Sequence, residues 1–269
     1  MLSRASLPPL AALVRRHDPD RFLASLFAPP AARETLFVLY AFDRELARAR
    51  VVTSEPMLAL IRLQWWREVV EGAARRHEIA TALRIALDRG ALHAESLLGL
   101  IGAREAEIEA GLPDLAAWRA FVAGTAGALA VAAGQVLGHA DAAAEETLRA
   151  AGAAYGAARL VNSVTREARA GRCRLPADLL AAAKLTPEDV IAAPGDARLG
   201  PVLERLRQEA AGLLARARTR LPRELLPAAL PVVLAARDLR RRADSPARVG
   251  RPLGDRLAVI LAGLRGRLA

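Results

Sequence analysis

The chain has 269 residues, of which 53% are apolar and only 4% aromatic, and its formal net charge is +10. One large core fits this length, the single cysteine excludes an internal disulfide, and the lack of interleaved aromatic residues argues against a nucleic-acid partner despite the basic charge. Ala and Leu dominate and no period-two alternation of β-branched residues occurs, so we predict an all-α fold of one domain.

The first part of the chain is assigned to an N-terminal extension, residues 1–16, followed by the folded domain, residues 17–269. The extension contains three arginines and no acid, as organelle-targeting segments do, but Pro8-Pro9 is expected to break any helix there and no secretory signal follows. No apolar run reaches the roughly 20 residues needed to span a bilayer. We therefore expect a cytoplasmic protein that can also lie peripherally on the inner face of the membrane.

Prolines, glycines and capping residues divide the chain up to residue 138 into helices. The predicted helices run over about 31–50, from 56 onwards, 79–89, 95–110 and from a cap at Asp114 through residues 121–138. The last of these contains Gly124, Gly127 and Gly134. Each glycine inside a helix costs up to about 1 kcal/mol relative to alanine, so we expect a packing or cavity reason for all three.

A long helix that begins at Asp141 is central to the prediction. Its apolar stripe passes through Tyr155 and then meets Asn162 and Arg166 at helical spacing, and Gly171 is typical of a helix end. We interpret this polar end as the mouth of a cavity. The alternative is that the last turn of the helix simply reaches the surface.

The C-terminal third continues with helices that start at the capping box Thr186 to Asp189 and at about residues 200, 226 and 253. The last thirty-three residues contain nine arginines and only three aspartates. Arg-rich amphipathic helices suit an anionic membrane surface or an acidic partner. The alternative is that these arginines only solvate the helices.

Carboxylates four residues apart on facing helices would be needed to hold Mg²⁺. Two pairs have this spacing, Asp141 with Glu145 and Glu105 with Glu109. We interpret the first as an ordinary acidic helix start and the second as a solvated face, with Glu107 pointing elsewhere. The histidines lack the spacing of a zinc site. The residues therefore predict no metal site, and no cofactor is expected.

Four segments carry a resemblance to a known family. YAFDR (residues 40–44), LQWWREVVEG (63–72), VAGTAG (122–127) and NSVTREARAGRCRLPADLL (162–180) resemble, in this order, motifs of the squalene/phytoene synthase family. The resemblance implies an isoprenoid synthase (terpenoid synthase-like) helical bundle around a central cavity. In active members it implies head-to-head condensation of two prenyl diphosphates with Mg²⁺.

The departures from the family pattern concern its aspartates. Where the first aspartate motif has its three acids, this chain has Ala47, Arg48 and Val51. The second motif is about three residues shorter, so that either Arg166 or Glu167 falls on a former aspartate position, depending on the alignment. At most one carboxylate survives there, and an arginine would repel Mg²⁺ but could pair with a phosphate.

This pattern is most similar to the branch of the family related to complex I assembly factor 6. The resemblance implies a non-catalytic protein that binds an isoprenoid diphosphate or lipid in its cavity and meets an anionic membrane or a respiratory-complex subunit. The predicted binding residues are Tyr40, Arg44, Asn162, Arg166, Glu167 and Arg172. One alternative is an active prenyl diphosphate synthase with substituted ligands, for which alone Mg²⁺ would be needed. The other is a helical scaffold with a filled cavity.

Overall fold

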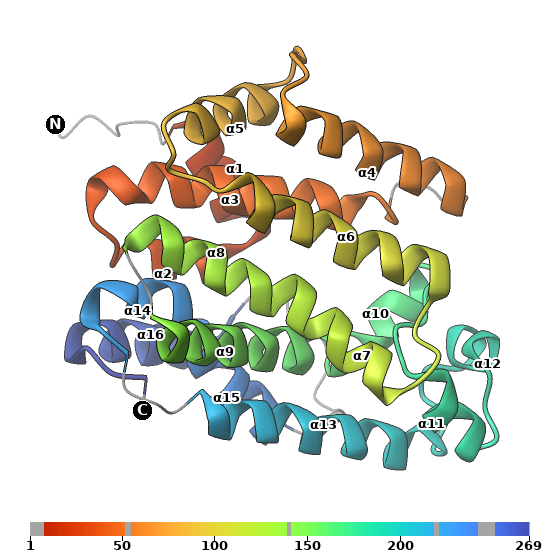
Figure 1. Ribbon diagram of the computed structural model, residues 1–269. Coiled ribbons are helices and arrows are strands. Elements are labelled where there is room, and N and C mark those ends of the chain that lie inside the picture. Colours follow the sequence, from red (N-terminus) through yellow and green to blue (C-terminus); the bar gives the residue numbers. More distant parts are fainter. Residues whose placement is uncertain (1–7, 52–54, 139–140, 218–220, 242–250, 269) are drawn as a thin grey trace, which may run out of the picture.

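The computed structural model describes residues 8–51, 55–138, 141–217, 221–241 and 251–268, which form helices and no strand (Figure 1). The helices are α1 (Pro9–His17), α2 (Pro19–Ser25), α3 (Pro30–Arg48), α4 (Pro56–Glu71), α5 (Glu78–Asp88), α6 (Ala94–Ala110), α7 (Leu115–Val122), the π-helix η1 (Ala123–Gly127), α8 (Ala128–Leu137), α9 (Ala142–Val161), α10 (Val164–Arg169), α11 (Ala177–Ala182), α12 (Pro187–Ala192), α13 (Leu199–Arg216), the 3₁₀ turn η2 (Arg223–Leu225), α14 (Leu226–Ala229), α15 (Val232–Arg240) and α16 (Leu253–Arg265). The predicted all-α class is confirmed.

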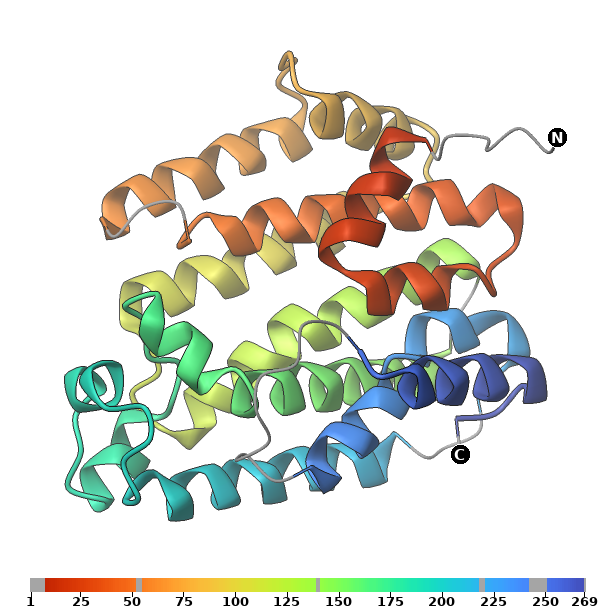
Figure 2. The same cartoon turned by 180° about the vertical axis from the view of Figure 1, so that it is seen from behind.

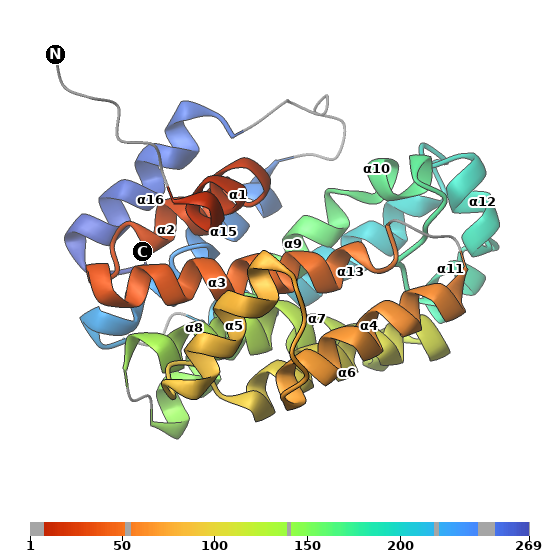
Figure 3. The ribbon, with the colours of Figure 1, turned by 90° about the horizontal axis from the view of Figure 1, so that it is seen from above.

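Helix α9 is the centre of the bundle. It packs against η1, α8, α13 and α15, and its side chains, mostly alanines, are buried around much of its circumference. Figure 1 shows α4, α5 and α6 above it and α13 below it. Figure 3 shows α1, α2, α15 and α16 gathered at one end of the molecule and α10, α11 and α12 at the other. The same helical layers are seen from behind in Figure 2.

Close contact between α9 and η1 explains the glycines of this region. A Cβ atom on Gly152 would lie 2.2 Å from the carbonyl oxygen of Ala126, and one on Gly127 would lie 2.9 Å from that of Arg149. A Cβ on Gly134 would come within 2.4 Å of Leu148 Cδ1. The expected reason for these glycines is therefore helix packing: side chains or backbone already fill the space beside them.

Most predicted helix ends are confirmed by their caps. The side chains of Asp114 and Asp141 accept hydrogen bonds from the third residue of α7 and α9, at 2.7 and 2.8 Å. Thr186 and Asp189 form the reciprocal capping box of α12. Gly171 has φ +69°, a left-handed conformation that glycine adopts without strain.

Two predicted segments differ from the structure. Pro8-Pro9 was expected to break any helix, but it begins α1, because proline is favoured in a first turn, where its missing N–H needs no partner. Ala11 and Val14 of α1 are buried against the bundle. The boundary at residue 16 therefore falls inside α1, and the division into extension and domain stays a prediction. The helix predicted over 226–242 is divided into α14 and α15 at Pro231.

The sequence analysis also missed one long apolar helical run. Residues Leu115–Leu137 of α7, η1 and α8 are long and apolar enough to cross a membrane by length and composition, with a mean hydropathy of 1.7. More than half of this apolar window, 56%, is buried inside the fold, where the run packs against α6 and α9. Burial of this kind is typical of a core helix.

A substitution at Gly152 tests the close contact of α9. Gly152→Ala should lower the free energy of unfolding by several kcal/mol, because the new methyl group would overlap backbone atoms that cannot move aside. Gly212→Ala is the matched control, since a Cβ atom meets nothing within 4 Å at this helical position and alanine should stabilise α13 by up to about 1 kcal/mol. Urea unfolding followed by circular dichroism measures both. Equal effects of the two substitutions would contradict the packing argument.

Candidate functional site

Tyr40, the first predicted binding residue, lies buried beside an arginine that the sequence analysis did not single out. The guanidinium carbon of Arg21 lies 5.7 Å from the centroid of the Tyr40 ring and 5.3 Å from that of Tyr155. Burial raises the pKa of Tyr40, although the charge of Arg21 acts in the opposite direction. The two aromatic rings thus hold a cation between α2, α3 and α9, at the place where an open cavity mouth was expected.

Arg21 belongs to a connected set of buried and partly buried charges that we call the inner ion-pair network. Its members are Asp18, Asp20, Arg21, Asp43, Arg104, Arg159, Arg237, Asp238, Arg241, Arg251 and Asp255. At one end of the network, Asp43 accepts a hydrogen bond from Arg104 at 3.1 Å and lies 3.9 Å from Arg21. The network runs from α6 and α3 through α2 and α9 to α15 and α16.

In the middle of the network, the Tyr155 hydroxyl accepts one hydrogen bond and donates another. Arg159 donates to the Tyr155 hydroxyl at 2.9 Å, and this hydroxyl donates to Asp20 Oδ2 at 2.8 Å. Burial raises the pKa of Tyr155, so the hydroxyl keeps the proton that it donates. Burial alone would raise the pKa of Asp18 as well, but the charges of Arg21 and Arg159 lower it below its ordinary value.

Arg251 joins the two ends of the chain. It donates to Asp20 Oδ2 at 2.9 Å and to Asp238 Oδ1 at 2.5 Å. Asp255, which is fully buried, accepts from Arg237 at 2.6 Å and from Arg241. Burial would raise the pKa of Asp255, but the hydrogen bonds from these arginines hold it below its usual range. Three arginines of the basic C-terminal segment are therefore structural rather than surface groups.

Two more predicted residues are already paired within the fold, Arg44 with an adjacent residue and Asn162 with a residue far along the chain. Arg44 is half-buried and pairs with the adjacent Glu45 at 2.6 Å, and Arg48 pairs with the same carboxylate at 3.0 Å. Asn162 follows the end of α9, where the predicted continuous helix breaks, and its side-chain amide donates to the backbone oxygen of Asp238 at 3.3 Å. Asn162 therefore borders the inner ion-pair network, as Tyr40 does, whereas Arg44 does not share their contacts.

The remaining three predicted residues lie at α10. Glu167 accepts from Arg172 at 3.0 Å and from Arg174 at 3.2 Å, while Arg166 has 69% of its side chain exposed. Burial opposes ionisation of Glu167, but the neighbouring arginines lower its pKa. Arg174 also pairs with Glu107, which is buried and not solvated. A void beside Glu167 and Arg172 has a volume of only about 10 Å³, which is room for one water at most.

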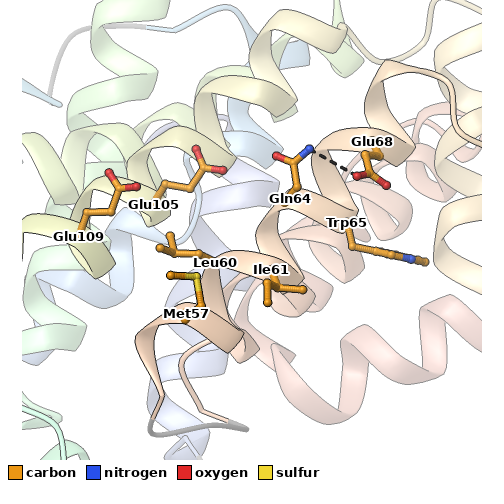
Figure 4. Close-up of a pocket in the computed structure, with 8 residues that line it drawn as sticks. All are labelled: Met57, Leu60, Ile61, Gln64, Trp65, Glu68, Glu105 and Glu109. Carbon is orange, nitrogen blue, oxygen red and sulfur yellow. Dashed lines mark hydrogen bonds between the residues drawn. The ribbon is translucent and has the colours of Figure 1, made fainter.

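A larger pocket than this void lies elsewhere, between α4 and α6 (Figure 4). Its volume is about 390 Å³, and its lining residues are Met57, Leu60, Ile61, Gln64, Trp65, Glu68, Glu105 and Glu109. Glu105, interpreted from the sequence as solvated, lies at this pocket and pairs with Arg67 at 2.5 Å. The sequence offers one signal for this pocket, the apolar residues of α4 together with the acidic pair of α6. These two segments are far apart in the chain.

The donors that are present do not fit a Mg²⁺ site. Within the described residues, no group of three or more His, Cys, Asp or Glu side chains is arranged to hold a metal ion. Asp43 on α3 is held by two arginines and Glu167 on α10 by three. An arginine cannot give up its proton to make way for a cation. Asp141 caps α9 and is engaged there.

Comparison with known proteins assigns the chain to a family. The squalene/phytoene synthase profile matches residues 14–260, nearly the whole chain. The chain belongs to the squalene/phytoene synthase family. Two relatives are called NADH dehydrogenase (ubiquinone) complex I, assembly factor 6. The rat protein is 26% identical over 229 residues, which cover 82% of this chain and 69% of the relative. The human protein is 39% identical over 59 residues, which cover 22% of this chain and 18% of the relative.

Solved structures of the family share the fold. A dehydrosqualene synthase in complex with a ligand superimposes with a TM-score of 0.71 at 13% identity, covering 94% of each chain. A squalene synthase from Alicyclobacillus acidocaldarius gives a TM-score of 0.67 at 19% identity, covering 96% of this chain and 92% of that one. The predicted isoprenoid synthase bundle is thereby confirmed, and at these identities the likeness concerns the fold alone.

The variant Asp255→Asn tests the inner ion-pair network. It leaves the arginines around position 255 without their charge partner and should lower the free energy of unfolding near neutral pH by about 3–5 kcal/mol. Because the pKa of folded Asp255 lies below its unfolded value of about 3.9, the stability from this carboxylate is complete above that value and is lost as pH falls through the folded pKa. The difference between wild type and variant should therefore shrink as pH falls from about 5 to 2.

Urea unfolding at a series of pH values measures this difference. The matched control is Asp196→Asn, which removes a solvent-screened pair with Arg198 at the surface and should change the stability far less than Asp255→Asn near neutral pH. A difference between wild type and Asp255→Asn that stays constant with pH would contradict the ionic role of Asp255.

Proposed function

We propose that this protein is a non-catalytic member of its family that acts in the assembly of a respiratory complex at a membrane. The observation that carries the proposal is the loss of free acids at the positions where the family resemblance places aspartates. Ala47, Arg48 and Val51 stand at the first motif, and Glu167, the acid that can remain at the second, is paired with Arg172 and Arg174. Without a bound cation, the negative charge of a departing diphosphate would be left without several kcal/mol of stabilisation.

The assembly role rests on the names of the relatives. Both the rat and the human relative are called assembly factors of complex I. A protein with this role needs a fold and surfaces, but no metal centre, which agrees with arginine pairs in place of free carboxylates. We extend the role to this chain as the function that these observations support best.

The ligand part of the proposal concerns a lipid or an isoprenoid. The pocket between α4 and α6 has the size of ordinary ligand pockets, and Leu60, Ile61 and Met57 give it apolar walls. Its lining residues include three glutamates and no cationic side chain, so nothing in that lining would neutralise a diphosphate. We therefore propose that this pocket takes the apolar chain of a lipid or isoprenoid, in place of the diphosphate that the sequence led us to expect beside Tyr40 and Arg44.

Incubation with farnesyl or geranylgeranyl diphosphate and Mg²⁺ tests the absence of catalysis. The protein should release no more diphosphate than a sample without protein, because no carboxylate cluster is free to hold the metal. An active dehydrosqualene synthase serves as the positive control. Mg²⁺-dependent release that disappears in Glu167→Gln would establish the alternative, an active prenyl diphosphate synthase with substituted ligands.

Deletion of the gene in its source organism tests the assembly role. The amount of assembled complex I on native gels should fall and should recover with the wild-type gene. Recovery should also occur with Arg48→Ala, since the proposal gives Arg48 no chemical role. An unchanged amount of complex I in the deletion strain would refute the assembly role, whatever the outcome of the diphosphate assay.

A further inference from the structure

Helix α16 turns a row of leucines outward. Its inner face buries Asp255, Val259 and Ala262, and a Cβ atom at Gly263 would meet the Phe27 ring at 2.6 Å, so that face is packed closely against the bundle. The other side carries Leu253, Leu257, Leu261 and Leu264, whose exposed fractions lie between 46% and 72%. Their spacing of four, four and three residues places all four on one face of the helix.

The charges around this row have one sign. Arg256 and Arg265 are exposed within α16, and Arg267 is exposed just after it. The one acid of the helix, Asp255, is fully buried and bonded to Arg237 and Arg241, so it contributes no negative charge to the outer face. The outward surface of α16 is therefore apolar along its middle and cationic beside it.

Other exposed apolar residues of the structure have different surroundings. Met57 and Ile61 lie beside Glu68, Glu105 and Glu109 at the acid-bordered pocket. Ile85 on α5 is 47% exposed, almost the same as Leu261 at 46%, but it stands alone on its helix, with both Arg84 and Asp88 nearby. Among the described residues, a row of several leucines bordered by arginines alone occurs on α16.

We propose that the outer face of α16, Leu253, Leu257, Leu261 and Leu264 with Arg256 and Arg265, docks on an anionic lipid bilayer. The leucines enter the boundary between head groups and acyl chains, and the arginines stay at the level of the lipid phosphates. A bilayer fits this face because exposed leucines form its middle and the charge of the arginines beside them complements anionic head groups. The proposal gives a surface to the membrane role proposed above, but it rests on that role only for its biological setting.

Flotation of the full chain with lipid vesicles tests the proposal. Binding to vesicles that contain phosphatidylglycerol or cardiolipin should exceed binding to pure phosphatidylcholine at least tenfold and should weaken as salt is raised. Leu257→Glu/Leu261→Glu should reduce binding tenfold or more. Arg256→Gln/Arg265→Gln should reduce binding to anionic vesicles roughly fivefold for each arginine and leave binding to neutral vesicles unchanged. Ile85→Glu is the matched control and should bind as the wild type does.

A fluorescent probe reports the depth of insertion without charge reversal. Cys173 is the only cysteine, so a Cys173→Ser background allows an environment-sensitive dye to be attached at Leu261→Cys or at Ile85→Cys. Emission should shift to the blue with anionic vesicles for the first position only. Equal responses at both positions, or flotation that ignores the leucine substitutions, would overturn the proposal.

Light scattering tests the alternative that a second copy of this chain, and not a bilayer, covers the outer face of α16. A dimer that Leu257→Glu/Leu261→Glu converts to monomers, together with unchanged flotation of that variant, would assign the face to self-association and refute membrane docking. These results do not depend on diphosphate release or on complex I levels, so the docking proposal and the proposed function can fail separately.

Discussion

The structure depends on the pairing of buried charges between helices. An ion removed from water costs several kcal/mol unless an opposite charge and hydrogen bonds replace its hydration, so every acid of the inner ion-pair network requires its arginines in place. Asp20 is held by Tyr155 and Arg251, and Asp43 by Arg104. These requirements fix how α2, α3, α9, α15 and α16 lie against one another more specifically than contacts among alanines and leucines could.

Under the proposed function, ion pairing also accounts for the absence of the reaction that the family's fold can support. A helical bundle that ionises prenyl diphosphates must keep carboxylates open towards a cavity, so that they can exchange water for a metal ion. Here the first motif offers no carboxylate at positions 47, 48 and 51, and Glu167 on α10 already has cationic partners from the chain itself. The arginines neutralise this carboxylate as a bound metal ion would. The helices therefore remain held together by opposite charges without a metal ion.

The sequence predicted structural features that depend on contacts between neighbouring residues, such as helix caps. It missed side-chain contacts between residues that are far apart in the chain. Capping residues located the starts of α7, α9 and α12, since a cap and the N–H groups that it binds lie within one turn. The helix predicted to run from Asp141 to Gly171 instead breaks at Asn162. The Tyr155 and Arg251 contacts with Asp20 join residues 135 and 231 positions apart, and no local pattern marks them. Of the nine C-terminal arginines, the sequence could not tell those that pair inside the fold from those that face outward. The candidate site was predicted only in part for this reason: Glu167 and Arg172 meet, but Arg44 has a partner of its own.

The bond between Arg251 and Asp20 has a consequence for how the protein is made. During synthesis, domains begin to fold from the N-terminal side, and here α2 emerges long before its counter-charge exists. Until the ribosome has added residue 251, Asp20 can meet the Tyr155 hydroxyl of α9 but lacks its cationic partner Arg251, so the docking of α2 on α9 is less stable than in the complete fold. The segment that carries Arg251 thus completes the docking of the N-terminal helices. A translation product that stops before residue 251 would expose these helices to proteases and chaperones.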